Sequence, residues 1–374
     1  MTPLALLIGI LTPPVDRTVS PSCRPDVALH YICNLERPED VRRIPGTKWL
    51  IVSGFANGSG LKLVDTERHT ATRWYTGNDP APDATKYPEC RQPPEVSTFN
   101  AHGISLRAIA PNHYRLHVVN HGGRESIEVF DVIASKKSPP EIHWKGCLPM
   151  PSGLAANAVA TFRDGTVLAT VLTRPGTSLA DFMQGRPTGG VYEWAPGARG
   201  FSLMPGTELP GNNGIETSPD EMHFYVVAFG WHSIVEFDRK NTAAPLRRFV
   251  APDFMPDNIQ WFRNGLIAAG MRLFEPACGG YRKIIHGIAD PMLCRRGYSV
   301  AFITLPVGSI ETIARGEPEP QFNGVSTAVV VGNTLWLGSY QADRLAYRPL
   351  RSTVTGDTRP RPLARPARGG SRRP

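Results

Sequence analysis

Short runs rich in β-branched and aromatic residues follow one another along this chain, separated by turns rich in Gly and Pro. The pattern predicts strands, because such side chains pack well on a pleated sheet. The 36 Gly and 36 Pro argue against a protein of long helices, and only 178–185 favours a helix. We therefore expect an all-β fold. The predicted strands are 48–54, 60–65, 114–120, 126–133, 165–172, 189–194, 223–230, 233–238, 265–271, 298–305 and 334–340.

Polar residues recur at the start of successive blocks of strands, at separations of 62, 55, 56 and 44 residues. They are Asp40, His102, Asn157, Asn213 and Asp257. A propeller blade of four strands needs roughly 40–50 residues. The spacing therefore predicts a six-bladed β-propeller, as a single domain over residues 31–350. Because the innermost strand of each blade begins near the central channel, we expect these positions to converge on one axis.

The two ends of the chain differ from the predicted propeller. Residues 1–30 contain an apolar run at 4–11 that is too short to span a bilayer. The run lacks the flanks of a typical secretory signal, and the sequence leaves open whether it is a truncated or atypical one. Residues 351–374 form an Arg/Pro-rich tail that we expect to be disordered, because it has almost no large apolar residues. Seven Arg and one Asp there carry +6 of the total +8, so the body gives no basis for a specific nucleic-acid partner.

The six cysteines show no zinc-binding spacing, and all flank segments that we interpret as loops. This placement favours disulfides in an oxidising compartment, and hence export to the periplasm or the exterior over a cytoplasmic location. Cys278 and Cys294 are close enough in sequence to form a local pair. Buried free thiols are the alternative. The cysteines are Cys23, Cys33, Cys90, Cys147, Cys278 and Cys294.

Carboxylate and amide side chains gather at the recurring polar positions. The candidate ligands are Glu39, Asn157, Asn213, Asp257 and Asn258. Oxygen donors without thiols suit a hard cation such as calcium, and two carboxylates would neutralise its charge. For any one residue alone, a solvated turn, an Asx-turn or a buried hydrogen bond is the simpler interpretation. The recurrence at blade spacing favours the metal, and we predict that "GNNGIETSPD" (211–220) is a turn whose Asn213 faces the channel.

Two histidines in strand-like settings are candidates for acid–base chemistry. His102 lies in "FNAHGISL" and His121 in "VVNHGGRESIEVF". Neutral His is the natural general base near neutral pH. If the two side chains meet above a metal ion, they form a proton-transfer pair; a structural role in the core is the alternative.

These segments together resemble the paraoxonase/arylesterase family, within the wider gluconolactonase-like calcium propellers. The motifs "PEDVRRIPG…WLIVSG", "FNAHGIS", "VVNHGGRESIEVF", "NAVA", "NNGIETSPD…FYVV" and "PDNI" occur in order over about residues 36–348. The resemblance implies a six-bladed propeller with a calcium ion at the floor of the active site. It places the ligands at the five candidate positions above and the catalytic histidines at His102 and His121.

The sequence departs from the family pattern in two ways. Where the paraoxonases have an aspartate ligand of a second, structural calcium ion, this chain has Ala158. Asp40 and the Ile104 carbonyl would remain for such a second site. The chain also has no cysteine near its C-terminus to tie the first and last blades together. We therefore expect the last blade to close by strand pairing, with "TLWLGSY" and "DRLAYRPL".

The expected function is calcium-dependent hydrolysis of a small lactone or aryl ester. A gluconolactonase-type sugar-lactone hydrolase and a non-catalytic, calcium-stabilised propeller that binds a partner are the alternatives. The sequence contains no G-x-S-x-G, H-E-x-x-H, P-loop or G-x-G-x-x-G motif, which argues against α/β-hydrolases, zincins, NTPases and dinucleotide-binding oxidoreductases. The long loop 272–297 is either a lid or a surface excursion pinned by a disulfide.

Overall fold

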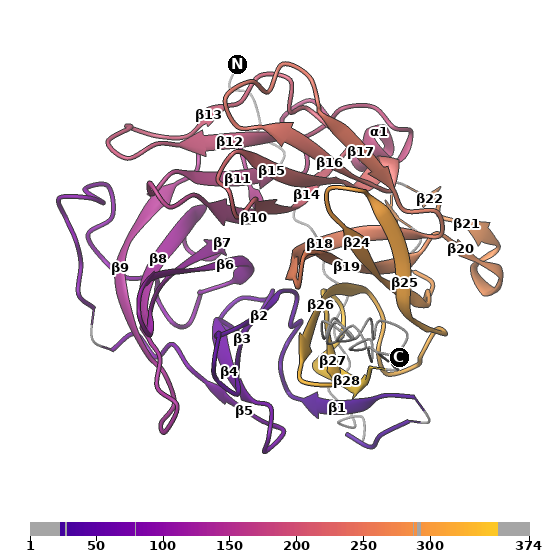
Figure 1. Ribbon diagram of the computed structural model, residues 1–374, viewed down its shortest axis with the longest axis horizontal. Coiled ribbons are helices and arrows are strands. Elements are labelled where there is room, and N and C mark those ends of the chain that lie inside the picture. Colours follow the sequence, from indigo (N-terminus) through magenta and orange to yellow (C-terminus); the bar gives the residue numbers. More distant parts are fainter. Residues whose placement is uncertain (1–22, 27, 79, 287, 290–292, 351–374) are drawn as a thin grey trace, which may run out of the picture.

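The computed structural model describes residues 23–350, apart from 27, 79, 287 and 290–292, and is a six-bladed β-propeller (Figure 1). Six four-stranded sheets surround a central axis, which confirms the predicted fold. Each innermost strand contacts the innermost strands of both neighbouring blades, so the ring is closed. The N-terminal segment through residue 22 and the Arg-rich tail lie outside the described residues. The innermost strands are β2 (Val41–Arg43), β6 (Ala101–Ala110), β10 (Ala156–Thr161), β14 (Asn212–Thr217), β18 (Phe254–Phe262) and β26 (Val325–Val331).

The remaining strands of each blade follow outward from the channel. Blade 1 continues with β3 (Trp49–Ser53), β4 (Leu61–Asp65) and β5 (Thr70–Arg73). Blade 2 continues with β7 (His113–Asn120), β8 (Ser126–Ile133) and β9 (Glu141–Pro149). Blade 3 continues with β11 (Val167–Val171), β12 (Gly190–Trp194) and β13 (Ser202–Leu203). Blade 4 continues with β15 (His223–Ala228), β16 (Ser233–Asp238) and β17 (Arg247–Val250). Blade 5 continues with β19 (Gly265–Arg272), β24 (Tyr298–Thr304) and β25 (Ser309–Gly316). Blade 6 continues with β27 (Thr334–Ser339), β28 (Arg344–Pro349) and β1 (His30–Cys33). Apolar clusters between neighbouring sheets form the core, such as Ile51, Leu116 and Phe130 between blades 1 and 2.

The sixth blade joins the two ends of the described chain. β27 and β28 are the two segments predicted for closure, and β1 supplies the fourth strand by antiparallel pairing with β28. The disulfide Cys23–Cys33 lies at the end of β1. The ring is therefore closed by backbone hydrogen bonds rather than by a disulfide between the first and last blades.

The prediction that 211–220 is a turn was wrong. Residues 212–217 form the innermost strand β14, which pairs with β15, and the turn follows at Ser218–Glu221. The segment lacks the apolar alternation of an ordinary strand because it lines the channel with polar groups. The innermost strands β6, β10 and β18 also carry polar residues near their starts, at His102, Asn157 and Asp257.

Short helices and one insertion complete the described chain. The helix predicted near 178–185 is α1 (Leu179–Met183), which begins at a capping box between Ser178 and Asp181. Two 3₁₀ turns are η1 (Phe229–Trp231) and η2 (Pro276–Cys278). In the part of the chain described here, none of the helices has the length and hydrophobicity of a membrane span. The insertion between β19 and β24 contains β20 (Phe274–Glu275), β21 (Gly280–Tyr281), β22 (Ile284–Ile285) and β23 (Ile288–Ala289).

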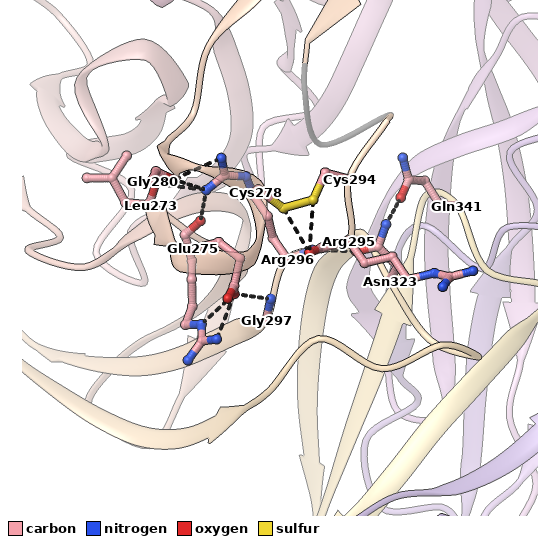
Figure 2. Close-up of a disulfide and its surroundings, with 11 residues drawn as sticks. Leu273, Glu275, Cys278, Gly280, Cys294, Arg295, Arg296, Gly297, Asn323 and Gln341 are labelled. Carbon is pink, nitrogen blue, oxygen red and sulfur yellow. Dashed lines mark hydrogen bonds and ion pairs between the residues drawn. A yellow bond between two sulfur atoms is a disulfide. The ribbon is translucent and has the colours of Figure 1, made fainter.

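Buried polar contacts fix the base of this insertion, as Figure 2 shows. The Arg296 side chain is buried and donates to the carbonyls of Leu273 (3.0 Å) and Gly280 (3.2 Å). Glu275 accepts from Arg272 at 2.6 Å. The Cys278–Cys294 disulfide closes the segment, so the local pairing expected from the sequence is confirmed. A third disulfide links Cys90 to Cys147.

Candidate metal and acid–base site

Backbone bulges in the innermost strands hold most of the candidate residues. The pairing register shifts between Ala101 and Ile104 in β6, and in the same way at 156–159 in β10, 212–215 in β14 and 256–259 in β18. Two residues therefore lie opposite one on the neighbouring strand, which redirects side chains that would otherwise alternate across the sheet. The residues inside these bulges include His102, Asn157, Asn213, Asp257 and Asn258.

Glycine is required next to two of these residues. A Cβ on Gly103 would lie 2.6 Å from the Asn157 carbonyl oxygen, and a Cβ on Gly214 would lie 2.5 Å from that of Asp257. Both distances are too short for non-bonded atoms. The innermost strands of neighbouring blades can therefore approach closely only because a glycine follows His102 and Asn213, and this approach draws the ring of candidate residues together.

Four of the five candidate ligands form two hydrogen-bonded pairs. Asn258 donates its amide to Glu39 Oε1 at 2.7 Å, and the Asn213 side chain is hydrogen-bonded to the Asp257 carboxylate. The other oxygens, Glu39 Oε2 and Asn213 Oδ1, are buried and have no hydrogen-bond partner. Asn157 is half-buried, and its backbone lies close to Gly103, the residue after His102.

Two unpartnered buried oxygens are costly unless a ligand satisfies them. Their chemistry, one carboxylate and one amide oxygen, fits a hard divalent cation. Within the described residues, no three His, Cys, Asp or Glu side chains form a metal cluster, so the candidate site depends on its amides.

Burial and neighbouring carboxylates destabilise the ionised forms of Glu39 and Asp257. Burial raises the pKa of Glu39 well above its usual range, and the nearby Asp257 and Asp40 charges raise it further. Burial raises the pKa of Asp257 to about 7, with Asp40 adding to the shift and the hydrogen bond from Asn213 opposing it. A cation among these groups would stabilise their ionised forms.

The two candidate histidines meet, and a glutamate extends them into a chain. His102 Nδ1 lies 2.9 Å from His121 Nε2, and His121 Nδ1 lies 2.9 Å from both carboxylate oxygens of Glu125. An ionised carboxylate only accepts hydrogen bonds, so His121 donates from Nδ1 and accepts at Nε2 when it is neutral. His102 then donates from Nδ1, which leaves the lone pair on its Nε2.

That lone pair faces the carboxylate cluster. His102 Nε2 is 3.6 Å from the unpartnered Glu39 Oε2. Burial and the neighbouring His121 lower the pKa of His102 well below its usual value, so the ring is neutral at neutral pH. The Phe55 ring stacks on His102, with centroids 4.1 Å apart and an angle of 13° between the planes. The arrangement is a neutral, oriented base beside a set of hard oxygen donors.

Sequence reasoning did not single out Glu125 or Phe55. Glu125 follows His121 by four residues in "HGGRES", and a carboxylate so close to a candidate histidine was the signal that could have found it. Phe55 lies in the loop after β3, and nothing in its local sequence distinguishes it.

Arg42 interacts with the two groups that were expected to bind a second ion, Asp40 and the Ile104 carbonyl. The Ile104 carbonyl accepts from Arg42 Nε at 2.8 Å, and Asp40 Oδ2 lies 3.5 Å from Arg42 Nη2. Asp40 also accepts from the backbone N–H groups of Ile104 (2.9 Å) and Val41 (2.8 Å). Ala158, at the position of the missing aspartate, is buried against Gly103. The guanidinium therefore already supplies a positive charge next to Asp40.

The insertion reaches the same end of the channel as these residues. Arg282 lies over the rings of Phe229 (4.5 Å) and Phe182 (5.8 Å), which belong to the loops of blades 4 and 3. Its charge acts on Asp257, whose pKa it lowers slightly against the larger effect of burial. Phe182 in turn packs against Gly211, two residues before Asn213. Both expectations for 272–297, a lid or a disulfide-pinned excursion, are compatible with this position.

The sequence matches no family model and no curated protein. Solved structures similar to this chain include a luciferin-regenerating enzyme, at 11% identity and a TM-score of 0.48 over 85% of this chain and 92% of that one. A gluconolactonase from Xanthomonas campestris is 16% identical, with a TM-score of 0.47 over 86% and 89%. The calcium-binding protein regucalcin from Agrobacterium tumefaciens is 12% identical, with a TM-score of 0.47 over 84% and 90%. None of them assigns this chain to a family.

Proposed function

We propose that this protein is a calcium-dependent lactone hydrolase. The observation that carries the proposal is the hydrogen-bonded chain Glu125–His121–His102, which ends 3.6 Å from the unpartnered Glu39 carboxylate oxygen. A structural ion would not need an oriented base beside it. A metal-dependent hydrolase that uses water as its nucleophile needs both the metal ion and the base.

The ligands of the ion would be Glu39, Asn157, Asn213, Asp257 and Asn258. A calcium ion held by them would act as a Lewis acid toward the carbonyl oxygen of the substrate. His102 Nε2 takes the proton of the attacking water, and its Nδ1–H holds the ring against His121. His121 and Glu125 then stabilise the imidazolium that forms, because the negative carboxylate lies at the far end of the chain.

Arg42 also explains why we propose one ion and not two. Its guanidinium hydrogen-bonds the Ile104 carbonyl and lies beside Asp40. A second cation at this place would meet a like charge and a carbonyl that already has a partner. Asp40 is therefore proposed to form a structural ion pair with Arg42, which also donates to the Ile104 carbonyl.

The test is hydrolysis of a substrate panel before and after chelation, with calcium and then magnesium restored. The panel contains glucono-δ-lactone, an aliphatic lactone, an aromatic lactone and phenyl acetate, so that sugar-lactone, acyl-lactone and aryl-ester specificities are separated. Activity lost on chelation and recovered with calcium alone supports the proposal. Protein that contains calcium and hydrolyses none of the panel would instead be a binding propeller with a structural ion.

A further inference from the structure

A cavity of about 580 Å³ opens at the mouth of the channel opposite the candidate metal site. It is lined by residues late in the innermost strands, such as Arg43 in β2, Arg107 in β6 and Trp261 in β18. Glu39 and Arg43 are four positions apart, which corresponds to about 13 Å along an extended chain. The cavity therefore lies beyond the candidate metal site, at the other end of the channel.

Two buried side chains close the channel between the cavity and the metal site. Arg42 donates to the carbonyls of Ile104 (2.8 Å) and Ile259 (3.2 Å). Gln260 donates to the carbonyls of Val41 (3.2 Å) and Ala328 (2.7 Å). These bonds cross-link the innermost strands of blades 1, 2, 5 and 6. A ligand in the far cavity would therefore occupy a site separate from the candidate active site.

The charge of the lining favours an anion. It contains four arginines, at 42, 43, 107 and 263, and one carboxylate, Glu216. Arg42 lies near Asp40 and Glu216, and Arg107 pairs with Glu221 at 2.9 Å. The lining itself contains more arginine than carboxylate side chains. A concave surface with low-dielectric walls focuses such a charge.

Arg43 is the residue best placed to bind the anion. Its side chain is exposed at the mouth, and its guanidinium reaches the Thr47 carbonyl at 3.5 Å. Within the described residues, no carboxylate lies in ion-pair range of Arg43. A planar guanidinium with most of its N–H groups directed to solvent can bind a carboxylate through two parallel hydrogen bonds.

The rest of the lining is apolar and aromatic. Leu106, Trp261 and Phe262 are half-buried there, and Val329 and Val330 are buried behind them. Trp261 is held in place by a hydrogen bond from its Nε1 to the Thr217 carbonyl, at 2.7 Å. Pockets of about 300–1,000 Å³ with apolar walls and a few polar groups are typical for small organic ligands.

We propose that this cavity binds a small organic anion with an apolar body, whose carboxylate pairs with Arg43 while its body packs on Leu106, Trp261 and Phe262. The site does not depend on the proposed hydrolase function. It differs from the candidate active site in position, and it requires no metal ion.

The experiment is calorimetric titration of the calcium-loaded protein with 1-naphthoate, and with 1-naphthalenemethanol as the neutral analogue of similar shape. We expect naphthoate to bind at least about tenfold more tightly than the alcohol, since a charge-assisted pair contributes roughly that much. Arg43→Gln should remove this preference and leave binding of the alcohol unchanged. Ala108→Trp, which fills the exposed mouth of the cavity, should weaken both ligands.

Two controls separate this site from the metal site. Arg68→Gln changes an exposed arginine on an outer turn of blade 1 and should leave both affinities unchanged. Chelation of calcium and Asp257→Asn should also leave naphthoate binding unchanged. Equal affinity for the two ligands, no binding at millimolar concentrations, or binding that is lost with Asp257→Asn but survives Arg43→Gln would each overturn the proposal.

Discussion

Calcium binding to the metal-free protein should release protons in an amount that depends steeply on pH. Burial raises the pKa of Asp257 from 3.8 to about 7 when no ion is present. At pH 6 this carboxyl is then about 0.9 protonated, and at pH 9 about 0.01. An ion that binds the carboxylate must displace this proton. We expect at least about 0.9 proton released per ion at pH 6, to which Glu39 adds its share, and a smaller release at pH 9, where Asp257 contributes almost none.

The same shift makes the metal-free fold sensitive to pH. A carboxyl whose pKa is raised in the folded state stabilises the fold below its unfolded pKa, and this contribution is lost as the pH rises through the folded value. For Asp257 the loss runs from about pH 4 to about pH 7 and amounts to about 4 kcal/mol. Stabilisation by calcium should therefore be larger at pH 8 than at pH 5.

Calorimetry in buffers of different ionisation enthalpy measures the protons released, and Asp257→Asn tests their source. The variant should release about one proton fewer per ion at pH 6, and it should bind calcium at least about tenfold more weakly because one charged ligand is gone. Glu216→Gln is the matched control, because Glu216 also has a pKa raised by burial but lies at the far cavity. Proton release that is equal at pH 6 and pH 9, or unchanged in Asp257→Asn, would refute the reasoning.

Three further predictions concern single side chains. His102→Gln should lower kcat by about 10²–10⁴ with calcium still bound, as steady-state kinetics and metal analysis would show; unchanged kcat would remove His102 as the base. Glu125→Gln should lower kcat and move the acid limb of the kcat/KM profile to lower pH, because the carboxylate no longer stabilises the imidazolium; an unmoved limb contradicts the positioning role. Arg42→Met should reduce the free energy of unfolding in urea by about 3–5 kcal/mol, since Asp40 and Glu216 lose their buried partner; a neutral variant would show that the pairing contributes nothing.

The sequence by itself determined the architecture and which residues gather at one end of the channel. Turns and β-branched runs specify short strands locally, and a recurrence close to fifty residues fixes the number of blades. Once the blades are counted, the residues that begin them must meet, because every innermost strand enters the channel at the same end. Glu39, His102, Asn213, Asp257 and Asn258 could be grouped in this way without coordinates.

The tertiary structure decided how those groups are bonded. Asn258 and Glu39 are 219 positions apart, and Arg42 reaches the Ile259 carbonyl over 217, so no local pattern encodes either bond. The tautomer of His102 follows from Glu125 only when the distances through His121 are known. The strand at 212–217 has the composition of a turn, and it forms because the backbone of β15 pairs with it along the channel wall. Periodicity specifies which residues converge, whereas hydrogen-bond geometry, burial and charge pairing depend on packing between blades that are distant in sequence.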